Sequence, residues 1–250
     1  STVMTGFWPH ANGCVTNNVR LPEKIPCLPE ILADSEYRTG YYGKWHLGDE
    51  LFAQHGFEEW ETIEDIYNEY FRPGKDRSRR STYDKFLREH GYKPDSPSGT
   101  FSRLFEAHMP IEHCKPRFLE LKATDFLRRH RNEPFILYVN FLEPHPPYFG
   151  PLNDEHKVEE MELPPNYAVP LGEDEPVAYR IKSQRDRQMR PEGMDLRTDE
   201  GWRRFIANYW GNVTLIDRSI GAILAELENL GLDDKTIVAF TSDHGDMLGS

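Results

Sequence analysis

Short apolar runs alternate with longer amphipathic segments along the chain. Three runs, 38–43, 135–141 and 236–241, are rich in aromatic and β-branched residues and predict β-strands. The second and third are almost continuously apolar. That pattern is typical of parallel strands covered on both faces.

Helical periodicity occupies the segments between these strands. Helices are predicted at 28–33, at 117–130 and from Thr198 or Asp199 to Gly231, and residues 1–6 end a helix at Gly6. The helix before Gly231 has the strongest pattern, because its apolar residues recur at intervals of three and four. They are Ile206, Tyr209, Val213, Ile216, Ile220, Ile223, Leu227 and Leu230.

Strands alternating with helices predict an α/β fold, a mostly parallel sheet sandwiched by helices. We interpret residues 1–250 as part of one domain. The periodicity breaks down at about 49–116 and 150–197, where proline, glycine and charged residues accumulate. These two stretches are predicted to be excursions from the sheet.

Titratable side chains follow each of the three predicted strands. Lys44 and His46 come after the first, His145 after the second, and Asp243 with His244 after the third. Ligands of open parallel sheets bind outside the carboxyl ends of the strands, so these side chains are expected to meet at one edge.

Each of these loops also allows a structural interpretation. Lys44 and His46 could present an ammonium and an imidazole to one anion, or end a strand as a solvated pair. His145 is stiffened by flanking prolines and suits anion contact, but also a surface turn. Asp243 and His244 could bind a divalent cation, or cap a turn.

The charge balance restricts the class of partner. The chain carries 30 Lys and Arg against 42 Asp and Glu, a net charge of -12. This balance argues against nucleic acid or an anionic membrane surface as the main partner. No apolar run reaches the roughly 18 residues that span a bilayer. The spacing of Cys14, Cys27 and Cys114 fits neither a disulfide framework nor a zinc site, so free thiols are expected.

Four motifs taken together resemble the type I sulfatases of the alkaline phosphatase superfamily. They are Ser1-Thr-Val-Met-Thr-Gly6 with Trp8-Pro9-His10, Gly43-Lys-Trp-His-Leu-Gly48, Pro144-His-Pro146, and Thr241-Ser-Asp-His-Gly-Asp-Met-Leu-Gly249. Their order and spacing agree with that family over essentially the whole chain.

The resemblance implies a sulfuric ester hydrolase that uses a metal-assisted formylglycine mechanism. It implies that Lys44 and His145 contact the sulfate, that His46 acts as a base, and that Asp243 and His244 bind the metal. The metal would be calcium, with manganese or magnesium as alternatives. The family's Cys-x-Pro-Ser-Arg motif, which carries formylglycine, is expected upstream of Ser1.

The same resemblance leaves several functions open. A sulfated carbohydrate or a small sulfate ester is the expected substrate. His244 stands where many sulfatases have asparagine, and histidine there also occurs in phosphonate monoester hydrolases, so a phosphonate or phosphodiester hydrolase is an alternative. A catalytically silent anion-binding domain is a third hypothesis for the function. A periplasmic or secreted location is favoured by the resemblance, and a cytoplasmic one is compatible with free cysteines.

Overall fold

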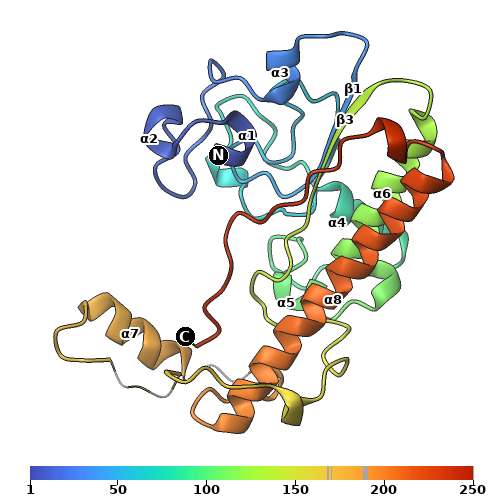
Figure 1. Cartoon of the computed structure of the whole chain (residues 1–250). Coiled ribbons are helices and arrows are strands. Elements are labelled where there is room, and N and C mark those ends of the chain that lie inside the picture. Colours follow the sequence, from blue (N-terminus) through green and yellow to red (C-terminus); the bar gives the residue numbers. More distant parts are fainter. Residues whose placement is uncertain (168, 170, 188–190, 250) are drawn as a thin grey trace. The chain divides into compact units, whose positions relative to one another are not determined.

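The computed structural model describes residues 1–167, 169, 171–187 and 191–249. The chain divides into two compact units (Figure 1). Unit 1 comprises 1–142 and 218–239, and unit 2 comprises 143–217 and 240–250. Each unit is described by itself below.

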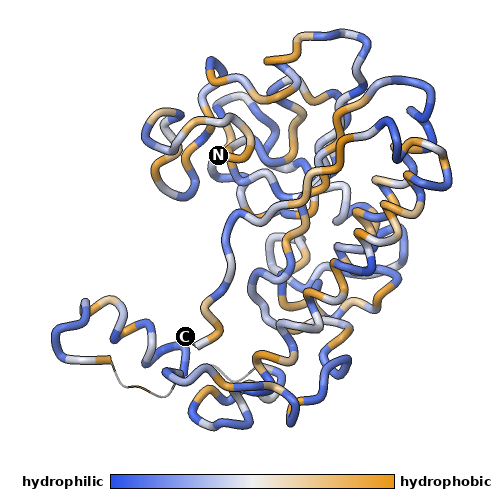
Figure 2. The backbone as a smooth tube through the Cα atoms, viewed as in Figure 1, coloured by the Kyte–Doolittle hydropathy of each residue, from blue (hydrophilic) through white to orange (hydrophobic). Residues whose placement is uncertain are grey.

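Unit 1 is built on a parallel sheet. Among the described residues the sheet has three strands in the order β2-β1-β3, namely β2 (Glu59–Glu61), β1 (Arg38–Gly43) and β3 (Phe135–Asn140). Both pairings of β1 are parallel, with Tyr41 opposite Trp60 on one side and Tyr138 on the other. Figure 1 shows β1 and β3 side by side, and Figure 2 shows that β3 is mostly hydrophobic. The prediction of a parallel sheet is confirmed.

The central strand β1 buries both of its faces. Tyr41 points into an aromatic cluster, with its ring centroid 5.0 Å from that of Trp45 and 4.7 Å from that of Trp60. Successive side chains of a strand point to opposite faces, so Tyr42 lies on the other side, where its ring meets Phe126 edge-on at 5.8 Å. Phe126 belongs to helix α6 (Lys115–Arg129). A helix therefore covers one face of β1 and aromatic side chains cover the other.

Unit 1 also contains several short helices. They are α1 (Thr2–Thr5), α2 (Pro9–Asn12), α3 (Leu28–Leu32), η1 (Asn68–Tyr70), α4 (Thr82–Glu89), α5 (Arg103–Ala107), η2 (Ile111–His113) and η5 (Asp233–Lys235). The predicted helices at 1–6, 28–33 and 117–130 correspond to α1, α3 and α6. Gly6 ends α1 in the left-handed conformation, with φ 72°, as the sequence indicates.

Unit 2 is organised around the first part of the long helix α8 (Asp199–Asn229), whose remaining residues belong to unit 1. Its other helices are η3 (Val158–Glu160), α7 (Val177–Asp186) and η4 (Pro191–Gly193). The ring of Phe205 on α8 meets Tyr148 edge-on at 4.8 Å and Trp202 at 5.7 Å. Helix α8 confirms the strongest helix prediction.

One predicted strand is wrong. Residues 236–241 form no strand, and their apolar side chains are exposed, with Ile237 97% and Phe240 82% accessible. A strand exists only where a second backbone segment supplies hydrogen bonds, and no described segment pairs with 236–241. Conversely, β2 lies within the predicted excursion at 49–116. Its three residues are too few to give an alternating pattern.

Cys14, Cys27 and Cys114 are all free, as expected. No helix in the described part of the chain is both long and apolar enough to cross a membrane.

Candidate active site

The loop after β1 is shaped by two glycines. Gly43 has φ 126°, and a Cβ there would lie 1.9 Å from the carbonyl oxygen of Asn140 on β3. Gly48 has φ 94°, and a Cβ there would lie 2.2 Å from Cγ of Arg20. Only glycine fits either position without moving a neighbour. Steric crowding therefore explains why glycine stands at both ends of the motif from Gly43 to Gly48.

Buried polar groups hold the backbone between these glycines. The carboxylate of Glu50 accepts the Trp45 N–H at 2.8 Å and the His46 N–H at 2.6 Å. The Lys44 carbonyl accepts the Tyr41 hydroxyl at 2.5 Å and the Asn140 side-chain amide at 2.6 Å. The sheet and Glu50 thus fix the loop from both sides.

Lys44 and His46 meet at one aromatic ring. The imidazole of His46 stacks on Tyr67 with the ring centroids 4.3 Å apart, and Nζ of Lys44 lies 5.6 Å from the centroid of the same ring. His46 Nε2 also lies 2.8 Å from Oδ1 of Asn18. The backbone of His46 is left-handed, with φ 54°, so a turn rather than an extended strand presents the two side chains to this ring.

A cluster of buried charges lies beside this pair. Glu64 is 2% exposed, and its carboxylate pairs with the guanidinium of Arg103 and with Nζ of Lys115 at 2.7 Å. Although burial opposes it, Lys115 and Arg103 lower the pKa of Glu64 to about 2. Burial raises the pKa of Glu106, which also contacts Lys115, to about 8. At neutral pH the four groups therefore carry one net positive charge.

The electrostatic environment of Lys44 follows from its burial and this cluster. Burial lowers the pKa of its half-buried ammonium, Glu64 opposes that shift, and Arg103 adds to it. Burial also raises the pKa of Glu50 to about 7. Lys44 is a cation in a partly desolvated site, where its attraction for an anion is less screened than on the open surface.

The remaining predicted site residues belong to unit 2. His145 is exposed, and its Nδ1 lies 2.8 Å from the Pro146 carbonyl oxygen. Asp243 and His244 are also exposed, and their segment is joined to that of His145 by a hydrogen bond from Tyr148 to Asp246 at 2.7 Å. The structure thus associates His145 with Asp243 and His244 in one unit, and Lys44 with His46 in the other. That all five form one site stays a prediction.

Asp243 and His244 fit part of a divalent-metal site. Oδ2 of Asp243 and Nε2 of His244 lie 3.6 Å apart, so that both could contact one ion after small rotations. The Gly245 carbonyl and the Asp243 carboxylate raise the pKa of His244. An oxygen and a nitrogen donor suit several divalent cations, but calcium takes six to eight oxygen ligands. Further ligands are needed to complete the site.

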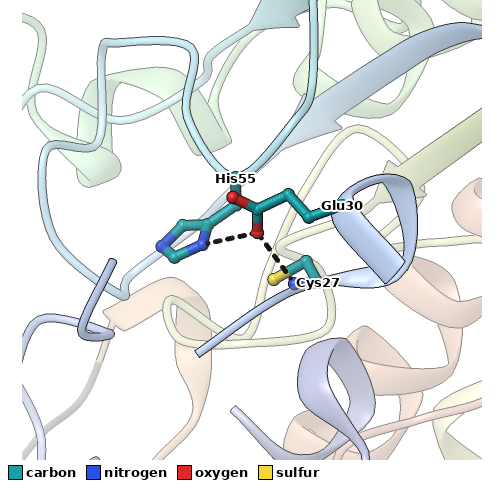
Figure 3. A group of neighbouring side chains, drawn as sticks. All are labelled: Cys27, Glu30 and His55. Atoms are coloured by element: carbon teal, nitrogen blue, oxygen red, sulfur yellow. Dashed lines mark hydrogen bonds and ion pairs between the residues drawn. The ribbon is translucent and has the colours of Figure 1, made fainter. Parts of the chain in front are cut away.

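A second group of ligating side chains lies in unit 1. Cys27, Glu30 and His55 each offer an atom within 4.8 Å of the other two, the only such group of three in the described residues (Figure 3). Glu30 already accepts the Cys27 N–H at 3.0 Å and contacts Nδ1 of His55 at 3.2 Å. Burial and Glu30 raise the pKa of Cys27 to about 12, so the thiol retains its proton. We interpret this group as a cap of helix α3.

Comparison with known proteins identifies the family. The family model described as Sulfatase matches residues 1–250. The chain belongs to the sulfatase family. Family membership confirms the resemblance carried by the four motifs, and this family generally uses a divalent metal.

Individual relatives and a solved structure agree with this assignment. The chain is 25% identical to the ulvan-active sulfatase of Formosa agariphila, covering 100% of this chain and 41% of the relative. It is 29% identical to the choline-sulfatase of Rhizobium meliloti, covering 100% and 48%. Its fold matches phosphonate monoester hydrolase from Silicibacter pomeroyi with a TM-score of 0.72 and 20% identity, covering 99% and 53%. The chain spans about half the length of these proteins.

Sequence reasoning missed the residues that support the loop. Asn18, Glu50, Tyr67 and Asn140 contact Lys44 or His46. Asn140 is the penultimate residue of the strand predicted at 135–141, and that position was a usable signal. Glu50 and Tyr67 fall in the stretch at 49–116, where no periodicity or motif marks them.

Proposed function

We propose that the full-length protein is a sulfuric ester hydrolase. The observation that carries the proposal is the convergence of Lys44 and His46 on one ring, in a loop fixed by Glu50 and the sheet. An ammonium and an imidazole held together in a partly desolvated site are suited to a tetrahedral oxyanion. Membership of the sulfatase family supports a sulfate ester as that anion.

The proposed roles follow from the charge and proton capacity of each side chain. Lys44 binds a sulfate oxygen and offsets the charge that develops during transfer. His46 accepts a proton as the general base for sulfate release, and its contact with Asn18 fixes the orientation of the imidazole. His145 contacts the sulfate or donates a proton to the departing alcohol. The nucleophile is proposed to be formylglycine, outside residues 1–250.

Asp243 and His244 are proposed to hold a divalent metal, calcium in the first instance and manganese or magnesium as alternatives. When bound, such an ion polarises the sulfate oxygens and the nucleophile. The carboxylate of Asp243 supplies a negative charge to the site. The proton of His244 must leave before its ring can bind a metal, so metal affinity is expected to rise with pH.

The proposed substrate is a sulfated carbohydrate or a small sulfate ester. The names of the two relatives, ulvan-active sulfatase and choline-sulfatase, show that specificity varies among similar chains. A second candidate function is hydrolysis of a phosphonate monoester or phosphodiester. His244 supports it, because the resemblance associates histidine there with phosphonate monoester hydrolases. Both substrate classes are tetrahedral anions.

The deciding experiment compares an aryl sulfate with an aryl phosphodiester as substrates of the full-length protein. The proposal predicts the higher kcat/KM for the sulfate. A preference of more than about a hundredfold for the phosphodiester, equivalent to about 2.7 kcal/mol of transition-state stabilisation, would overturn it. Intact-protein mass spectrometry would show whether formylglycine is present.

A further inference from the structure

We propose that Tyr67 is a positioning residue of this site, holding Lys44 and His46 in the arrangement that receives the anion. The inference rests on the proposed function and extends it to a residue that no motif marks. Tyr67 lies in the stretch at 49–116, immediately before η1, and is half-buried.

The ring of Tyr67 contacts both functional side chains. His46 stacks on Tyr67 at 4.3 Å between centroids, with 29° between the ring planes. Nζ of Lys44 lies 5.6 Å from the same centroid. A cation within about 6 Å of an aromatic centroid is attracted by the negative face of the ring. Tyr67 therefore restricts the rotation of the imidazole and attracts the ammonium toward its own ring.

Tyr67 is itself held by a buried ion pair. Nη2 of Arg103 donates to the Tyr67 hydroxyl at 3.0 Å, and the same guanidinium pairs with Glu64. Glu64 is also held by Lys115, which is 3% exposed. Buried charges that are paired in this way have little freedom to move. Helices α5 and α6, which supply Arg103 and Lys115, thus help to hold the ring in place.

These contacts give Tyr67 a function different from filling space. Lysine has four rotatable side-chain bonds, and fixing such a side chain costs conformational entropy. A ring that limits the conformations of Lys44 before substrate arrives reduces the cost of ordering it at binding. The hydroxyl serves only to anchor the ring to Arg103. The ring, more than the hydroxyl, should therefore determine the rate.

The test uses three variants of the full-length protein. Tyr67→Phe keeps the ring, Tyr67→Leu removes it, and Tyr70→Leu is the control. Tyr70 ends η1, three residues after Tyr67, is exposed, and has no contact with Lys44 or His46 in the described part of the structure. Steady-state kinetics on the aryl sulfate and the aryl phosphodiester are measured beside thermal unfolding. The proton resonances of the His46 ring, assigned by comparison with His46→Gln, report the stacking directly.

The proposal predicts a fall in kcat/KM of about tenfold or more for Tyr67→Leu, and a change within about threefold for Tyr67→Phe and Tyr70→Leu. The His46 resonances should shift in Tyr67→Leu and remain nearly in place in Tyr67→Phe. A purely structural role would lower the unfolding temperature without moving these resonances selectively.

Two results would overturn the proposed role of Tyr67. Both can be distinguished from a result that overturns the proposed function. Unchanged His46 resonances in Tyr67→Leu would contradict the stacking, and kcat/KM within twofold of the unaltered protein would contradict the positioning role. If the unaltered protein hydrolyses only the phosphodiester, the sulfatase proposal fails while the same comparison still tests Tyr67. If the unaltered protein hydrolyses neither the aryl sulfate nor the aryl phosphodiester, both the proposed function and the role of Tyr67 are overturned.

Discussion

Replacing Glu50 by glutamine tests how the loop from Gly43 to Gly48 is held. Glu50 is 1% exposed, and its two carboxylate oxygens accept the N–H groups of Trp45 and His46 at 2.8 and 2.6 Å. Glutamine has nearly the same shape but offers one oxygen and one NH₂ group. One backbone N–H would then face a donor, and an unsatisfied buried donor costs about 1–3 kcal/mol. The loop around His46 should lose one of its two anchors.

The pH dependence of this variant gives a sharper test than its stability at one pH. Burial raises the pKa of Glu50 from 4.5 to about 7. Between these values the folded protein retains a proton that the unfolded chain has released. The stabilising contribution is therefore complete below pH 4.5 and is lost as the pH rises through 7. The shift corresponds to about 3 kcal/mol in the free energy of unfolding.

The measurement compares urea unfolding of the unaltered protein and Glu50→Gln from pH 4.5 to 8 at constant ionic strength. The difference between their free energies of unfolding should fall by about 3 kcal/mol as the pH rises, because glutamine does not titrate. Glu106, whose pKa is raised to about 8, affects both proteins and cancels in the difference. The reasoning would be refuted if the difference between the two free energies of unfolding changed by less than about 0.5 kcal/mol between pH 4.5 and 8.

Three further predictions concern the loop, the charge cluster and the metal. Gly43→Ala should destabilise the protein by at least about 2 kcal/mol more than Gly74→Ala in urea unfolding, because a Cβ at Gly43 would lie 1.9 Å from a backbone oxygen whereas a Cβ at Gly74 has nothing within 4 Å; equal losses would contradict it. Glu64→Gln should cost about 3–5 kcal/mol, since Arg103 and Lys115 would remain buried without their partner; a loss below about 1 kcal/mol would exclude this account. Chelation should abolish turnover, calcium should restore it, and Asp243→Asn should require more calcium; full activity in protein shown by elemental analysis to be metal-free would refute the proposed metal site.

The sheet and the long helices could be predicted because their signals are local. Strand β1 is a compact aromatic run ended by Gly43, and α8 repeats apolar residues at helical spacing for about seven turns. The run at 236–241 has the same local signal and forms no strand. Apolar composition shows which segments favour a sheet, whereas pairing depends on a partner elsewhere in the chain.

The candidate site was predictable only as far as its motifs extend. Lys44 and His46 stand out because the glycines beside them mark a tight loop after a strand. Glu50 and Tyr67 act through contacts made after the chain has folded, and nothing in their sequence neighbourhood distinguishes them from other surface-loop residues. The left-handed backbone of His46, whose N–H donates to Glu50, likewise has no local signal in the sequence.

The most direct test of the proposed function is Lys44→Ala in the full-length protein, with Lys93→Ala as the control. Lys93 is an exposed lysine in the same unit. Hydrolysis of the aryl sulfate is measured beside thermal unfolding for both variants. We predict that Lys44→Ala lowers kcat/KM by about a thousandfold with an unfolding temperature close to that of the unaltered protein, while Lys93→Ala retains full activity. A Lys44→Ala protein that is folded and retains activity within about tenfold would contradict the assignment of this loop to the active site.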